Sequence, residues 1–110
     1  MSLPEQQMTE DFWNLTLFIA GKQNPKSVAA YANLKQICEE HLPSASYNLQ
    51  VIDISVDPEI AIAEDILAIP TLLRKAPPPK RRLIGDLSDT RRVLVSLGVQ
   101  SMVPSEESGG

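Results

Sequence analysis

Cys38 is the one side chain here whose type could support redox chemistry, because the 110-residue chain contains a single cysteine. A reactive thiol needs exposure to solvent and a nearby positive charge that lowers its pKa. Cys38 instead lies in the middle of the apolar face of a predicted helix, so we expect a buried, structural cysteine. A redox enzyme that uses this single thiol is the alternative, and it requires a thiol that reacts in the native state.

The other chemically active side chains form no catalytic pattern. His41 is the only histidine, and its helix offers no second candidate ligand for a metal or partner for acid–base chemistry. The acidic pairs Glu39-Glu40 and Glu64-Asp65 fit exposed helix faces better than a catalytic dyad. No glycine-rich phosphate loop is present. The sequence therefore predicts a protein that is not an enzyme and that uses no cofactor or metal.

Length and composition indicate one globular domain. A chain of 110 residues with 43% apolar and 22% charged residues can bury a single core. The longest apolar run, near residues 15–20, is too short to span a bilayer, and the first residues do not resemble a signal peptide, so we expect a cytoplasmic protein. Residues 1–11 and 103–110 are polar and acidic, and they predict flexible tails around a domain at residues 12–102.

Four short segments predict strands, at residues 13–20, 47–55, 71–76 and 80–86. The first of them is dense in leucine, β-branched and aromatic residues, as expected of a buried strand. Three consecutive prolines, Pro77 to Pro79, separate the last two. Because proline cannot donate a hydrogen bond to a sheet, this segment must be a stiff connector, and we expect the two strands beside it to be antiparallel neighbours.

Three helices are expected between and after these strands. The first begins at the cap Ser27 and continues to Leu42. The last begins at Ser88 or Asp89 and stops at Gly98. The second begins at Asp57-Pro58, and its buried face is expected to contain Ile60, Ala63 and Leu67.

The order of these elements, βαβαββα, predicts an α/β domain with a mixed sheet. Pro70 at the start of the third strand completes a thioredoxin-like arrangement, and we expect a cis peptide bond before it. Thioredoxin-type enzymes carry their nucleophilic cysteine in the loop after the first strand, where the helix N-terminus stabilises negative charge. Residues 21–27 contain no cysteine, and capping is a sufficient role for Ser27. The sequence predicts the fold without its redox chemistry.

The stretch "AIPTLLRKAPPPKRRLIGDLSDTRRVL" resembles the signature half of the KaiB family. Its specific features are the triple proline, the pair Arg81-Arg82, and Gly85-Asp86-Leu87-Ser88. The N-terminal half agrees in "LFIAG" and "LQVIDI", and the resemblance covers most of residues 13–97.

This resemblance implies a non-enzymatic clock or regulatory protein that binds the ATPase KaiC. The family has a thioredoxin-like fold, which binds KaiC, and a tetrameric ground state with a rearranged second half. The resemblance therefore leads us to expect a homo-oligomer, a dimer or a tetramer. The rearranged fold is the alternative to the thioredoxin-like arrangement. Pro70, Gly85 and Asp86 would have structural roles. The alternative function is a thioredoxin-like adaptor or stress-response protein that binds another partner.

Two departures from the family pattern bear on these expectations. Asp65 stands where the cyanobacterial clock members have lysine, on a surface associated with KaiC binding. Ser96-Leu97-Gly98 replaces Gly-Leu-Asp, which moves glycine from inside the last helix to the position after it, where glycine is favoured. We therefore expect the thioredoxin-like fold to be the resting state, with residues 90–97 helical.

Positive charge is concentrated in one segment. Seven of the ten basic residues lie between Arg74 and Arg92 with only two acidic residues, giving that segment a net charge of +5 against −9 for the remainder. The segment has no aromatic residue to stack on bases, so an acidic protein is a better candidate partner than nucleic acid. An ordinary solvated face is the other interpretation.

The family resemblance places the partner-binding surface at this cluster. The residues implied are Arg82, Arg81, Arg74 and Lys75, together with Glu64, Asp65 and Trp13. Because side chains alternate along a strand, Arg81 and Arg82 should point to opposite faces, and only one of them can enter a given interface.

Overall fold

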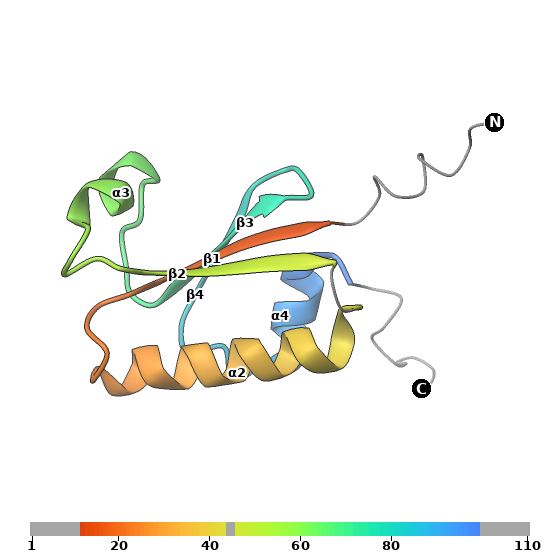
Figure 1. Ribbon diagram of the computed structural model, residues 1–110. Coiled ribbons are helices and arrows are strands. Elements are labelled where there is room, and N and C mark those ends of the chain that lie inside the picture. The colour runs from red at the N-terminus through yellow and green to blue at the C-terminus, as the bar shows by residue number, and fades with distance from the viewer. Residues whose placement is uncertain (1–11, 44–45, 100–110) are drawn as a thin grey trace.

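A four-stranded mixed sheet organises the molecule, with the strand order β2-β1-β3-β4 (Figure 1). This computed structural model describes residues 12–43 and 46–99. Strand β1 (Trp13–Ile19) pairs with β2 (Tyr47–Asp53) in parallel. Strand β3 (Thr71–Ala76) runs antiparallel to β1, and β4 (Arg81–Ile84) runs antiparallel to β3. With the helices α2 (Pro25–His41), α3 (Pro58–Ala63) and α4 (Thr90–Leu97), the predicted order βαβαββα is confirmed.

Helices cover the two faces of the sheet unequally (Figure 1). Helices α2 and α4 lie on one face and enclose the main core, which includes Leu15, Leu17, Leu34, Leu72 and Leu97. On the opposite face, beside the short α3, a small cluster of Phe18, Ile52 and Leu73 is packed by Ile54, Ile66 and Ile69. The sheet is therefore deeply covered on the α2/α4 face and thinly covered on the α3 face.

Helix α2 begins earlier than the sequence predicted. Asn24 is the cap, because its side-chain oxygen accepts a hydrogen bond from the Ser27 amide at 3.0 Å, and Pro25 occupies the first turn. The prediction that Ser27 is the cap was wrong. Ser27 is buried inside the first turn, and its hydroxyl accepts a hydrogen bond from the amide of Ala20 at 3.3 Å. The signal in the sequence was Asn24-Pro25, since proline is preferred directly after a cap.

Helix α3 ends earlier than predicted, at Ala63. Asp65 adopts a left-handed backbone conformation with φ 62°, and the Ile66 amide returns to the Ala61 carbonyl at 2.9 Å. This Schellman-type ending turns the chain away, so the predicted apolar face is wrong. Leu67 is 91% exposed, and Ala61 is the buried residue of the helix.

Helix α4 follows the prediction closely. Asp89 is its cap, and the side-chain carboxylate accepts a hydrogen bond from the Arg92 amide at 3.2 Å. Val93, Leu94 and Leu97 are buried, and Gly98 ends the helix with φ 82°. Residues 90–97, including Ser96, are thus helical in this structure, as expected for the thioredoxin-like state.

The expected cis peptide bond between Ile69 and Pro70 is present, and two more occur at Ala76-Pro77 and Pro78-Pro79. The predicted tails at 1–11 and 103–110, and the domain boundary at residue 102, lie outside the described residues. Within residues 12–43 and 46–99, none of the helices has the length and apolar character needed to cross a membrane.

Candidate partner-binding surface

The pairing of β3 with β4 divides the predicted basic cluster between the two faces of the sheet. Arg74 lies opposite Arg81, and Leu73 lies opposite Arg82. Arg74 packs against α4 on the well-covered face, whereas Arg82 reaches α3 on the thinly covered face. The predicted separation of Arg81 and Arg82 is therefore confirmed, and it extends to Arg74 and Lys75, which are also neighbours along a strand.

Four charged residues meet on the α3 face, and we call them the Glu64 cluster: Glu64, Lys75, Lys80 and Arg82. The Glu64 carboxylate lies 3.5 Å from Lys75 Nζ and 3.2 Å from Lys80 Nζ. Arg82 Nη2 donates to the backbone carbonyl of Glu64 at 2.7 Å. The hydrogen bond from Lys80, together with the charges of both lysines, lowers the pKa of Glu64. Three cations around one carboxylate give this surface a net positive charge suited to an acidic partner.

Arg74, predicted to face a partner, lies in the interior. The residue is 6% exposed, and its guanidinium donates from Nη1 to the Ser96 carbonyl at 3.1 Å and from Nη2 to the Pro79 carbonyl at 2.8 Å. Within the described residues its Nε has no hydrogen-bond partner. Burial, followed by the nearby charge of Arg81, lowers the pKa of Arg74. We therefore correct its role: Arg74 joins the last turn of α4 to the proline connector.

Trp13 is also part of the core and not of the surface that the resemblance implied. The residue is 7% exposed, and the indole Nε1 donates to the Leu97 carbonyl at 2.7 Å. Arg74 and Trp13 thus bind two adjacent carbonyls at the C-terminus of α4, which lack partners within the helix. Trp13 and Leu97 are 84 positions apart in the sequence, so no local pattern could have predicted this contact.

The loop between β4 and α4 contains the two remaining structural candidates, Gly85 and Asp86. Gly85 has φ 126°, a conformation that favours glycine, and its amide donates to the Pro70 carbonyl at 3.0 Å. The Asp86 carboxylate accepts a hydrogen bond from the Ser88 amide, and its carbonyl accepts one from Asn33 Nδ2 on α2. These contacts fix the loop to Pro70, directly before β3, and to α2.

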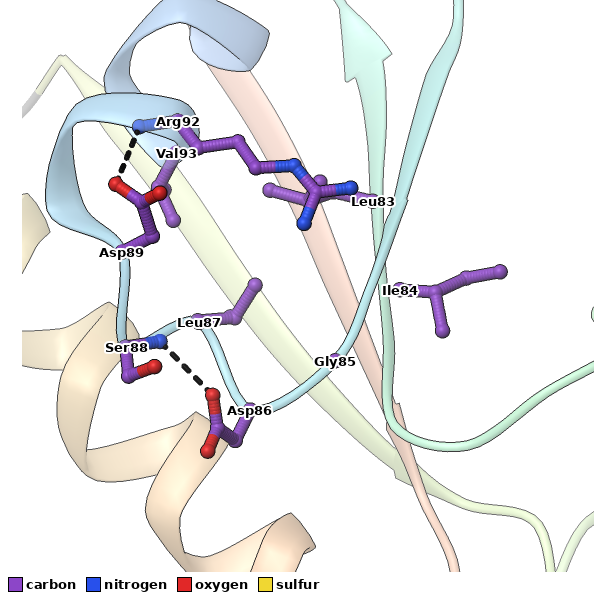
Figure 2. A pocket seen from close by; sticks show the side chains of 9 residues that line it. All are labelled: Leu83, Ile84, Gly85, Asp86, Leu87, Ser88, Asp89, Arg92 and Val93. Atoms are coloured by element: carbon purple, nitrogen blue, oxygen red, sulfur yellow. Dashed lines mark hydrogen bonds between the residues drawn. The ribbon is translucent and has the colours of Figure 1, made fainter.

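This loop encloses a small hollow of about 70 Å³, shown in Figure 2. Asp86 and Asp89 are each bonded to backbone amides there, while the Arg92 side chain extends toward Leu83. Ligand pockets typically have volumes of roughly 300 Å³ or more. The geometry therefore favours a structural role for the loop. A larger open hollow of about 390 Å³, not predicted from the sequence, lies between the start of α2 and β2 and is lined by Ile19, Gly21, Lys22, Ser27, Val28, Tyr31 and Val51.

Cys38 is fully buried, as predicted, and burial raises the pKa of its thiol to about 11. Both effects oppose reactivity, because the thiolate is the nucleophile and little of it forms at neutral pH. Within the described residues, no group of three or more histidine, cysteine, aspartate or glutamate side chains is placed to hold a metal ion.

We expect Cys38 to react with a thiol reagent at pH 8 at least about 100-fold more slowly in the native protein than in denaturant, given a pKa raised by burial. The measurement is the rate at which the thiol releases the coloured thiolate from a chromogenic disulfide reagent, in native buffer and in denaturant. Equal rates would show that the thiol is accessible and would revive the redox alternative.

Comparisons with known proteins agree with the fold and identify the family. The chain is 44% identical over 98 residues to the circadian clock oscillator protein KaiB of Prochlorococcus marinus subsp. pastoris, covering 87% of this chain and 90% of that protein. It is 47% identical over 83 residues to the protein of the same name from Microcystis aeruginosa, covering 76% and 78% of the two chains.

Solved structures confirm the thioredoxin-like fold. The N-terminal domain of Synechococcus elongatus SasA superposes with a TM-score of 0.68 at 22% identity, covering 96% of this chain and 91% of that domain. Chloroplastic thioredoxin z superposes with a TM-score of 0.64 at 19% identity, covering 92% of each chain. The profile of the KaiB domain matches residues 16–99. The chain therefore belongs to the KaiB family.

Proposed function

We propose that this protein is a non-catalytic, cytoplasmic regulator that binds a KaiC-type ATPase in a clock or timing system. The observation that carries the proposal is the identity of 44% over 90% of the length of a circadian clock oscillator protein KaiB. Such similarity over a whole domain supports a shared partner as well as a shared fold.

The Glu64 cluster is the surface we assign to this partner. It gathers Lys75, Lys80 and Arg82 on the thinly covered face of the sheet, beside the exposed Asp65 and the end of α3. A net positive surface speeds the encounter with an acidic one. Arg81 lies on the other face, so Arg82 is the arginine of the pair that we place in the interface.

A direct binding measurement tests the function. The full chain is mixed with the purified KaiC-type ATPase encoded in the same genome, in a buffer that contains ATP. Complex formation is followed by sedimentation velocity. We expect co-sedimentation that weakens as salt increases. A complex with a different protein, and none with the ATPase, would favour the thioredoxin-like adaptor instead. We also propose that the protein forms a homo-oligomer, a dimer or a tetramer, and sedimentation velocity of the chain alone tests this.

A further inference from the structure

One carboxylate occupies the middle of the proposed binding surface. Each oxygen of Glu64 has its own lysine, with Oε1 3.2 Å from Lys80 Nζ and Oε2 3.5 Å from Lys75 Nζ. The Glu64 side chain is 19% exposed, whereas those of Lys75 and Lys80 are 36% and 52% exposed. Both lysines could therefore reach a partner, but in the free protein each already has a counter-charge.

Arg82 is held differently. It donates to the backbone carbonyl of Glu64 and not to the carboxylate. That backbone is fixed by the turn that ends α3, where the Glu64 amide donates to the Ile60 carbonyl at 3.0 Å. Removal of the carboxylate charge should therefore leave Arg82 in place while it releases the two lysines.

We propose that Glu64 is an internal competitor, which restrains the two lysines until an acidic partner displaces it. This inference rests on the proposed function, in which an acidic surface of a KaiC-type ATPase meets the Glu64 cluster. The carboxylate neutralises one of three cations and also repels incoming carboxylates within a Debye length of about 8–10 Å. A glutamate is already ionised at neutral pH, and the hydrogen bond from Lys80, with the charges of both lysines, lowers the pKa of Glu64 further.

An opposite role for Glu64 makes an opposite prediction. If its carboxylate positioned the lysines for the partner, then loss of the charge would disorder them and slow binding. Competition predicts instead that loss of the charge speeds binding. The sign of the change in association rate therefore distinguishes the competing role of Glu64 from the positioning role.

The first experiment compares Glu64→Gln with the control Glu39→Gln. Glu39 also pairs with a lysine, Lys35, at 3.3 Å, but on α2. Both variants lose one negative charge, so they alter the net charge equally. At low ionic strength we expect Glu64→Gln to raise the association rate with the KaiC-type ATPase about two- to five-fold, and Glu39→Gln less than about 1.5-fold. The Glu64→Gln advantage should vanish at high salt. An unchanged or slower rate for Glu64→Gln overturns the inference.

The second experiment measures the ion pairs without the partner. Acylation of individual lysines by an amine-reactive ester, followed by mass spectrometry, should show faster modification of Lys75 and Lys80 in Glu64→Gln only, and of Lys35 in Glu39→Gln only. If labelling changes but the association rate does not, Glu64 holds the lysines without regulating binding, and the inference alone fails. If neither the wild type nor Glu64→Gln binds the ATPase, both the inference and the proposed function fail.

Discussion

Replacement of Arg74 by glutamate is expected to lower the free energy of unfolding by about 3 kcal/mol or more, because it buries an unpaired charge. The new carboxylate would face the carbonyl oxygens of Ser96 and Pro79, which now accept hydrogen bonds from the guanidinium. For a domain of this size, such a loss lowers the melting temperature by roughly 12 °C or more. Differential scanning calorimetry or thermal circular dichroism measures the change in melting temperature.

Two controls assign this loss to the buried charge. Arg74→Met retains the apolar stem and leaves the two carbonyls without donors, so we expect a smaller loss of about 1–3 kcal/mol. Arg81→Glu makes the same reversal at the exposed residue opposite Arg74, and it should change stability by less than about 0.5 kcal/mol. An Arg74→Glu protein that melts like the wild type would contradict the burial of Arg74.

Local sequence patterns predicted the parts of this fold whose stabilising contacts are local or repeat along the chain. Helix α4 has a cap at Asp89, buried residues at helical spacing, and Gly98 at its end, and each feature appears where it was expected. Alternation along β4 likewise predicted that Arg81 and Arg82 separate. The burial of Cys38 followed from the apolar face of α2.

Contacts between distant segments decided what the sequence could not predict. Arg74 was expected at the surface because the family resemblance placed the binding surface at the basic cluster, but it is buried because α4 packs over that face of the sheet. The position of Trp13 depends on the same helix, because its indole donates a hydrogen bond to the carbonyl of Leu97. The early end of α3 depends on a left-handed Asp65, at a position where glycine or asparagine would have been the recognisable signal.

Charge reversal at Arg82 has the largest expected effect on binding. Arg82→Glu removes the hydrogen bond to the Glu64 carbonyl and places a second carboxylate in the Glu64 cluster. The net charge of that cluster then changes from positive to neutral, so electrostatic attraction to an acidic partner is lost. We expect association with the KaiC-type ATPase at low ionic strength to slow by about tenfold or more, with a weaker dependence on salt.

The most direct test of the assigned surface is the ratio of association rates for Arg82→Glu and Arg81→Glu, measured by stopped-flow or biolayer interferometry at low salt. The two variants change the net charge equally at adjacent positions on opposite faces of β4. If the α3 face binds the ATPase, Arg82→Glu slows association about tenfold while Arg81→Glu changes it by less than about threefold, and both melt like the wild type. Equal slowing by the two variants, or slowing by Arg81→Glu alone, would contradict the assignment of the Glu64 cluster as the binding surface.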